Sequence, residues 1–278
     1  MTLTVTLILL LSGLIHASWN AMVKATGDRV TMLGVLYGTM GVIALIALPF
    51  VPPLAEGAWI YLLPAGIVHV VYKFGIIKMY QHGDLGLVYP VARGIAPVGV
   101  MVLALLLADE IPTTIQITGI ALVCMGLFGF LGRNAGASFR ALGYAILTGL
   151  IIASYTVLDG LGVRSTASPF SFAAWIFIID GFGTLALTLY LRRGAFFTAA
   201  LPILKIAIPG GAIAGFAYVA VMWALGQGTM GSVSAIRESS IVFAAIIGTL
   251  FLGEPMGSRR IIASIIVLIG IVVLNLGL

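Results

Sequence analysis

Gly13-Leu-Ile-His-Ala-Ser-Trp19 recurs later in the chain as Gly149-Leu-Ile-Ile-Ala-Ser-Tyr155. The same register continues toward the end of each half, where charged residues, glycines and prolines reappear at matched places. The matched pairs are Arg93 with Arg237, Glu110 with Glu254, Gly126 with Gly270, and Pro64 with Pro209. The repeat predicts a duplicated unit, with residues 1–138 as one half and residues 139–278 as the other.

The repeat lies in a chain whose composition is typical of membrane proteins. Of the 278 residues, 61% are hydrophobic and 8% are charged, and the mean hydropathy is +1.20. A bilayer core needs roughly 20 apolar helical residues per crossing, and glycines, prolines and charges divide the chain into ten such stretches. The predicted spans are residues 3–23, 32–50, 58–81, 85–107, 114–132, 139–158, 169–191, 202–225, 232–252 and 258–277.

An odd number of spans in each half determines how the two halves are related. Because the first unit crosses the bilayer five times, the second unit enters from the opposite side, as in many secondary transporters. Backbone in lipid must satisfy its own hydrogen bonds, which favours helices. The predicted fold class is therefore an all-α membrane protein of ten transmembrane helices, arranged as two inverted five-helix repeats around a central cavity.

The distribution of basic residues predicts an orientation. The odd-numbered linkers hold almost all the cations, whereas Arg164 stands alone in the even-numbered ones. By the positive-inside rule the odd linkers are cytoplasmic and both termini face outward. Because no basic residue precedes Lys24, we expect the stretch 3–23 to be a retained span rather than a signal peptide. The cations of the odd linkers are Lys24, Arg29, Arg133, Arg140, Arg192, Arg193, Arg259 and Arg260.

The chain contains four further motifs: Val88-Tyr-Pro-Val-Ala-Arg93-Gly, Ala235-Ile-Arg237-Glu-Ser-Ser240, Leu-Leu-Ala-Asp-Glu110 and Leu-Phe-Leu-Gly-Glu254-Pro. These motifs resemble those of the EamA-type members of the drug/metabolite transporter superfamily, and the resemblance covers essentially the whole chain. It implies alternating-access transport of amino acids, sugars, nucleotide-sugars or cationic drugs. Among bacterial members it extends to the YddG-like amino-acid exporters, which implies export across an inner membrane. Such proteins have both termini in the cytoplasm, so the resemblance and the charge distribution leave the orientation open.

Polar and aromatic residues inside the spans are candidate site residues, because ionisable groups at bilayer depth are costly and usually face a cavity or a partner. His16, Trp19 and Asn20 follow the spacing i, i+3, i+4, which puts them on one helical face, and the same spacing recurs in the span 58–81. Such a surface suits an amphipathic solute, although interhelical packing explains it as well. The residues predicted to line the cavity are His16, Trp19, Asn20, His69, Tyr72, Lys73, Tyr89, Arg93, Tyr155, Trp223 and Arg237.

The charged residues of the later spans suggest two roles. Arg93 and Arg237 bind an anionic solute group or alternate between gate partners, because a guanidinium offers two parallel donors to a carboxylate; otherwise they satisfy helix-end carbonyls. Glu238 and Asp180 either pair with a cation or carry a proton. We therefore expect Glu238 and Asp180 to act in coupling or gating.

Two prolines in the span 85–107 are further gating candidates. Pro90 and Pro97 each remove an intrahelical hydrogen bond, and we expect them to interrupt this helix. A bent or broken helix is useful where a cavity must open and close. Trp175 and Tyr218 are additional site candidates whose facing the sequence does not settle.

Several function classes find little support. No phosphate-binding Gly-x4-Gly-Lys-Ser/Thr motif and no His-Glu-x2-His zinc motif occurs, so ATP-driven and metalloprotease chemistry are not expected. The single Cys124 allows no internal disulfide, and we expect neither a metal nor a cofactor. The net charge of +5 comes from scattered cations, which excludes a nucleic-acid face. The expected partners are a small-molecule substrate and the lipid bilayer, with the chain a monomer or a weak homodimer; an intramembrane enzyme and a passive channel remain as alternatives.

Overall fold

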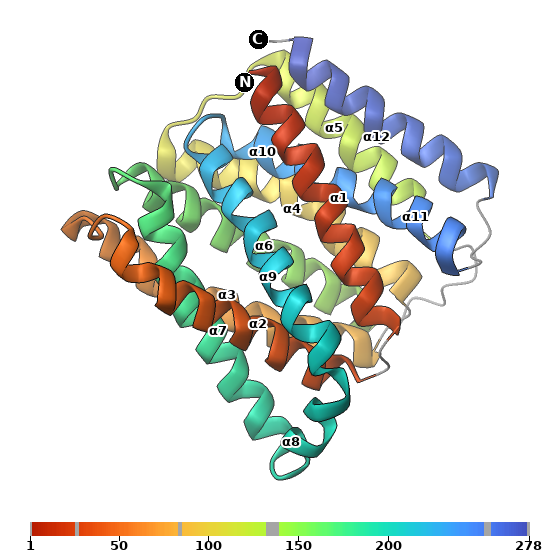
Figure 1. The fold of residues 1–278 in the computed structure, drawn as a ribbon. Coiled ribbons are helices and arrows are strands. Elements are labelled where there is room, and N and C mark those ends of the chain that lie inside the picture. Colours follow the sequence, from red (N-terminus) through yellow and green to blue (C-terminus); the bar gives the residue numbers. More distant parts are fainter. Residues whose placement is uncertain (1, 26–27, 83–84, 132–138, 253–256, 277–278) are drawn as a thin grey trace.

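The computed structural model describes residues 2–25, 28–82, 85–131, 139–252 and 257–276 (Figure 1). Within these residues every regular element is a helix. Nine helical segments are long and apolar enough to cross a bilayer, and α5 is a shorter apolar helix. This confirms the all-α, ten-helix fold class. The elements are α1 (Leu3–Ala25), α2 (Arg29–Ala47), α3 (Trp59–His82), α4 (Leu85–Ala108), α5 (Thr114–Gly129), α6 (Phe139–Arg164), α7 (Pro169–Arg192), α8 (Ala195–Ala200), α9 (Leu204–Leu225), α10 (Met230–Arg237), α11 (Ser239–Leu252) and α12 (Ser258–Leu276), with short 3-10 turns at Leu48–Phe50, Glu56–Ala58 and Leu201–Ile203.

The sixth span is longer than predicted. The sequence suggested an end at residue 158, but α6 continues to Arg164. Asp159 and Gly160 were the apparent boundary, yet both are buried inside the bundle. An acidic residue followed by glycine resembles a helix end only where water reaches it, and here neighbouring helices surround the pair.

The expected interruption occurs in a different helix from the one predicted. α4 is continuous through Pro90 and Pro97, so the prediction of a broken span 85–107 was wrong. The predicted span 232–252 instead consists of α10 and α11, which meet at Glu238. The amide of Glu238 donates to the carbonyl of Ala235, a tighter turn than an α-helix makes.

Contacts between the two halves come in matched pairs. α2 packs on α7 and α5 packs on α12, each helix against its own counterpart. The contact of α3 with α6 is matched by that of α1 with α9, and the contact of α4 with α6 by that of α1 with α11. A duplicated five-helix unit predicts such a pattern.

Glycines allow these helices to approach closely. A Cβ atom on Gly181 of α7 would lie 2.7 Å from the Cα of Gly41 and 2.7 Å from the carbonyl oxygen of Tyr37, both backbone atoms of α2. The two glycines of the internal repeat have similar neighbours. A Cβ on Gly149 would lie 2.7 Å from the carbonyl oxygen of Ala92, and one on Gly13 would lie 2.7 Å from Ser239 Oγ, each at the matching helix of the other half.

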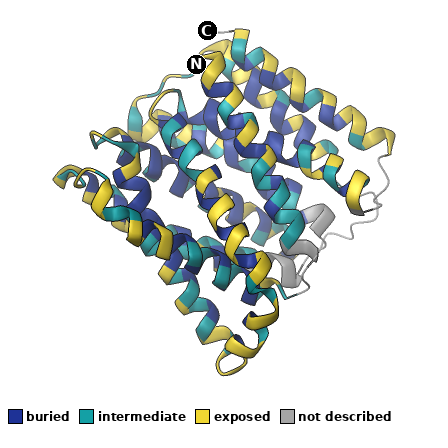
Figure 2. Cartoon of the chain, viewed as in Figure 1, coloured by how far each residue is buried: buried dark blue, intermediate teal, exposed yellow. Residues whose placement is uncertain are grey.

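The ten crossings alternate in direction, so the start of α1 and the end of α12 lie at one end of the bundle (Figure 1). Thr6 Oγ1 donates to Asn275 Oδ1 at 2.6 Å and joins these two segments. We call this end the terminal face, and the end that carries α8 the opposite face. Exposed residues cover the outside of the bundle and buried ones fill its interior (Figure 2). Many of the exposed side chains are large and apolar, as contact with lipid requires.

The α2–α7 contact yields a stability prediction. Gly181→Ala places a methyl group against backbone that cannot rotate away, so we expect the free energy of unfolding to fall by about 1–3 kcal/mol. Gly143→Ala is the matched control, because this helical glycine has nothing within 4 Å of its Cβ position. Unfolding by SDS in mixed micelles measures both variants. Equal stability of the two variants would contradict the close approach.

Candidate functional site

A cavity lies in the middle of the bundle, among α1, α2, α3, α4, α6, α7, α9 and α10. About 660 Å³ of its space holds no atoms, including the part open to solvent. Both halves of the chain contribute to its wall, which combines aromatic rings with charged groups. The lining residues are Ser12, His16, Trp19, Tyr37, Met40, His69, Tyr72, Lys73, Arg93, Tyr155, Ile176, Phe177, Asp180, Ala214, Ala217, Tyr218, Val221 and Arg237.

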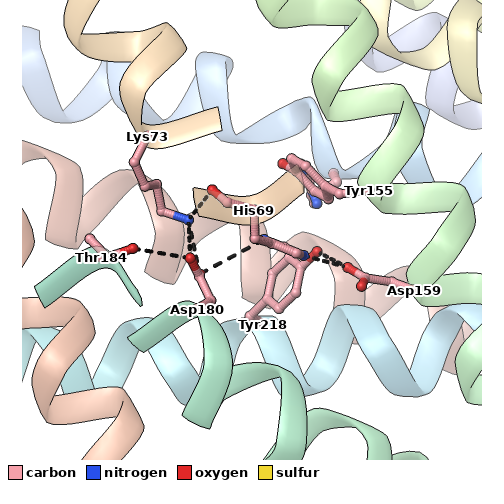
Figure 3. Close-up of polar contacts among 8 residues, drawn as sticks. His69, Lys73, Tyr155, Asp159, Asp180, Thr184 and Tyr218 are labelled. Atoms are coloured by element: carbon pink, nitrogen blue, oxygen red, sulfur yellow. Dashed lines mark hydrogen bonds and ion pairs between the residues drawn. The ribbon is translucent and has the colours of Figure 1, made fainter. Parts of the chain in front are cut away.

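A buried ion pair joins the two halves on one wall. Lys73 Nζ of α3 lies 3.0 and 2.9 Å from the two carboxylate oxygens of Asp180 on α7 (Figure 3). Thr184 Oγ1, one turn further along α7, donates to Asp180 Oδ1 at 3.1 Å. The Lys73 ammonium also lies 4.1 Å from the centre of the Tyr37 ring, a cation–π contact. Because both groups are buried, each depends on the other for its charge to be tolerated.

His69 lies one turn before Lys73, between two carboxylates. Its Nε2 lies 2.9 Å from Asp159 Oδ2, and its Nδ1 lies 3.8 Å from Asp180 Oδ2. Tyr218 of α9 donates to the same Asp159 oxygen at 2.7 Å, and the ring of Tyr155 stacks on the imidazole at 4.2 Å (Figure 3). The imidazole is therefore held by α6 and α9 and faces α7.

Arg93 of α4 is neutralised by Glu238, at the junction of α10 and α11. Arg93 Nε lies 2.7 Å from Glu238 Oε2, although the geometry is that of an ion pair rather than of an aligned hydrogen bond. Arg93 Nη2 donates to Ser240 Oγ at 3.2 Å. Glu238 is fully buried, so this pair also joins the two halves in the interior.

Arg237 differs from Arg93 in having an incomplete set of partners. Its Nη2 donates to the hydroxyl of Tyr155 at 3.3 Å, and its guanidinium lies 5.8 Å from the centre of the Tyr218 ring. Among the described residues, neither its Nε nor its Nη1 has a hydrogen-bond partner. The side chain is buried and is one of the residues that line the cavity, so a cationic group with unused hydrogen-bond donors lies at the cavity wall.

The predicted face of α1 divides into two parts. His16 and Trp19 line the cavity, with their rings 5.0 Å apart in an edge-on arrangement. The indole Nε1 of Trp19 is buried and has no hydrogen-bond partner in the described part of the chain. Asn20 does not line the cavity; its amide donates back to the carbonyl of His16 at 2.8 Å.

Other predicted residues lie behind the lining. Tyr89 and Trp223 pack against a cluster of buried apolar residues that includes Val100 and Leu225. The Arg93 guanidinium lies 5.8 Å from the centre of the Tyr89 ring. Pro90 and Pro97 are buried within α4. Tyr72, by contrast, lines the cavity and meets Tyr155 edge-on at 5.3 Å. Trp175 is not one of the lining residues, and the centre of its ring lies 5.1 Å from that of Trp59.

The most consequential residue missed by the sequence reasoning is Asp159. The predicted sixth span ended one residue before it, which assigned it to a linker. Tyr37, Thr184 and Ser12 were also missed, because tyrosine and hydroxyl residues are common at helix interfaces. A signal was nevertheless present: Asp159 follows Tyr155 at i+4, on the face that the repeat had already marked.

Among the described residues, the buried cations and the buried carboxylates around the cavity are equal in number. Three cations, those of Lys73, Arg93 and Arg237, stand with the carboxylates of Asp159, Asp180 and Glu238. After the pairs Lys73–Asp180 and Arg93–Glu238 are formed, Arg237 and Asp159 remain without an ionic partner of fixed charge among the described residues. Asp159 Oδ1 accepts no hydrogen bond from them either. The cavity region thus has one surplus positive group and one surplus negative group.

Two further ion pairs close the ends of the bundle. Arg192 at the end of α7 pairs with Asp28 before α2, at the opposite face. Burial raises the pKa of Asp28, but the hydrogen bonds from Thr31 and Arg192 and the positive charge of Arg192 lower it by more. The pKa of Asp28 therefore lies below its ordinary value. At the terminal face, Arg164 Nη1 lies 2.6 Å from Glu110 Oε1. Each pair joins one half of the chain to the other.

The arrangement of the described residues does not include a group of three histidine, cysteine or carboxylate side chains that could hold a metal ion. The charged and aromatic side chains that line the cavity offer ionic contacts and hydrogen bonds beside aromatic surfaces.

Comparisons with known proteins bear on the family and the fold. The model of the EamA-like transporter family matches residues 139–276. A solved structure described as "Crystal structure of protein" superposes with a TM-score of 0.77 over 99% of both chains, at 16% sequence identity. At that identity the likeness shows the fold alone. No curated protein sequence matches the chain.

The Lys73–Asp180 pair yields the second prediction. Lys73→Met leaves the Asp180 carboxylate buried without its cation, and we expect the free energy of unfolding to fall by about 3–5 kcal/mol. In the double variant with Asp180→Leu, most of this loss should be recovered, because both charges are removed. Lys205→Met, at an exposed position of α9, is the control. A double variant less stable than Lys73→Met would argue against the pairing.

Proposed function

We propose that this membrane transporter of small solutes carries amino acids, including aromatic ones. The proposal starts from the match of residues 139–276 to the EamA-like transporter family. The family consists of transporters rather than enzymes. We further propose that the protein works as an exporter by alternating access in a bacterial inner membrane, with residues 1–138 and 139–278 as inverted halves.

The observation that carries the choice of substrate is the unpaired buried charge beside the cavity. Among the described residues, two nitrogens of Arg237 have no hydrogen-bond partner, and the cluster of Lys73, Asp180 and Asp159 has one carboxylate in excess. A zwitterion supplies a carboxylate for the first and an ammonium for the second. Because an unpaired buried charge is costly, a solute with both groups gains more here than an amine or an acid alone.

The remaining lining supports an aromatic or apolar side chain. Trp19 and Tyr72 face the cavity from the first half, and Phe177 and Tyr218 from the second. Rings of this kind give large contact surfaces for an apolar group. The buried Nε1 of Trp19, unpartnered among the described residues, adds one donor to the wall.

Alternating access is supported by the ion pairs at the two ends. Asp28–Arg192 lies at the opposite face and Glu110–Arg164 at the terminal face. Both join the halves, so a rocking motion of one half against the other breaks one pair while the other is retained. The α2–α7 and α5–α12 contacts provide the surfaces about which such a motion turns.

Reconstitution in proteoliposomes tests the substrate class. We expect unlabelled L-phenylalanine inside the vesicles to drive uptake of labelled L-phenylalanine, with saturation. Phenethylamine, which lacks the carboxylate, and 3-phenylpropionate, which lacks the ammonium, should compete at least tenfold less well. Equal competition by either analogue would contradict recognition of a zwitterion, and unsaturable flux would indicate a channel.

Arg237 provides the corresponding variant. Arg237→Gln removes a charged donor worth about 1.5–3 kcal/mol, so the half-saturating concentration of L-phenylalanine should rise roughly 10- to 100-fold. Phenethylamine should lose no affinity, because it has no carboxylate to bind. Arg259→Gln, at an exposed position of α12, is the control. An unchanged half-saturating concentration in Arg237→Gln would exclude Arg237 from substrate binding.

Cross-linking across the end pairs tests alternating access. In a Cys124→Ala background, a reversible bifunctional thiol reagent can join Asp28→Cys to Arg192→Cys, or Glu110→Cys to Arg164→Cys. We expect either cross-link to abolish counterflow, since each holds one end shut, and a reductant to restore it. Single-cysteine variants treated with the same reagent are the controls. Full counterflow with both ends cross-linked would contradict the mechanism.

A further inference from the structure

His69 lies on the cavity wall between two buried carboxylates. Tyr155 contacts both His69 and Arg237, the proposed donor to the carboxylate of the solute. We propose that His69 is a proton-binding site, and that a proton bound there excludes the ammonium group of the solute, so that protons and amino acids are exchanged. This inference rests on the proposed function and names the ion coupled to it.

The geometry of His69 leaves one nitrogen for an incoming proton. Nε2 lies 2.9 Å from Asp159 Oδ2, a carboxylate oxygen that accepts, so Nε2 carries the hydrogen in the neutral ring. Nδ1 then has the lone pair, and it lies 3.8 Å from Asp180 Oδ2. A proton that adds to Nδ1 forms an imidazolium with a carboxylate on each side (Figure 3).

The charges of the surrounding cluster favour a single added cation. Lys73 neutralises Asp180, and within the described part of the chain the carboxylate of Asp159 has the hydroxyl of Tyr218 and the imidazole as its donors. With neutral His69 the cluster has a charge of −1. Either a proton on Nδ1 or an ammonium in the cavity brings it to zero, whereas both together leave it at +1. Because unbalanced charge in the interior is costly, the two cations compete.

Every helix packed against the imidazole contributes to this balance. The ring of Tyr155 stacks on His69 at 4.2 Å, and its hydroxyl accepts from Arg237, so the charge of Arg237 opposes a second cation. His16 of α1 lines the same cavity. The titratable and charged groups that face His69 are Asp159 and Tyr155 of α6, Asp180 of α7, Tyr218 of α9, Lys73 of α3 with Tyr37 of α2 behind it, and Arg237 of α10 through Tyr155.

Competition between the two cations gives coupling. If the solute leaves on one side of the membrane and a proton takes its place, the return of the empty carrier moves the proton the other way. The effect is reciprocal, because the proton weakens the binding of the solute by the same factor as the solute weakens the binding of the proton. A proton bound at His69 therefore lowers the affinity for L-phenylalanine.

The experiment uses proteoliposomes that contain the pH indicator pyranine, with potassium and valinomycin holding the membrane potential at zero. When L-phenylalanine is added outside at equal pH, we expect the lumen to become alkaline, by about one proton lost per labelled phenylalanine gained. In His69→Gln this ratio should fall to near zero, and L-phenylalanine binding should lose its dependence on pH. His69→Lys, which imitates the protonated ring, should bind L-phenylalanine at least tenfold more weakly than His69→Gln.

The control is His82→Gln, at the last residue of α3, which should retain about one proton per phenylalanine. Wild-type protein that exchanges labelled phenylalanine without moving protons, or with acidification of the lumen, overturns the proton site and leaves the proposed function standing. A ratio near one in His69→Gln assigns the proton elsewhere and also overturns it. Wild-type protein that exchanges no phenylalanine overturns both proposals.

Discussion

The structure depends on the pairing of charges in an interior that water does not solvate. An unpaired ion in such a place costs several kcal/mol, so a carboxylate close by stabilises a buried cation, and two of the three cations described around the cavity have one. Lys73 pairs with Asp180, and Arg93 pairs with Glu238. In both pairs the partners come from different halves of the chain, so the charges that make the cavity also hold its two sides together.

This constraint is effective only because the helices approach closely. Gly41 and Gly181 bring the backbones of α2 and α7 together, and Gly149 brings α6 onto α4. These contacts set the depth of Asp180, which is on α7, and of Arg93, which is on α4. The position of the buried ions therefore depends on helix contacts made through small residues.

The sequence was informative where a pattern had one physical cause. Apolar lengths predicted the helices, and the cost of buried charge singled out Lys73, Asp180 and the two arginines, all of which line the cavity. It failed where local and tertiary effects compete. Asp159 was taken for a helix end because acidic residues next to glycine usually are, and Pro90 was taken for a break although α4 accommodates it. Asn20 shares a face with His16, but its side-chain amide donates a hydrogen bond to the backbone carbonyl of His16 in the same helix.

The sequence by itself determined the fold class, the ten apolar stretches and the set of residues too polar to face lipid, because these follow from the composition of single segments and from the thickness of a bilayer. Only the tertiary structure decided which charges are paired and which are left over. Sequence spacing places Arg93 and Arg237 at matched positions, yet one has a carboxylate at 2.7 Å and the other has two nitrogens unpartnered among the described residues. That difference arises from contacts between helices far apart in the chain, and pair energies at such short range change with shifts of a few ångströms that no pattern within one helix encodes.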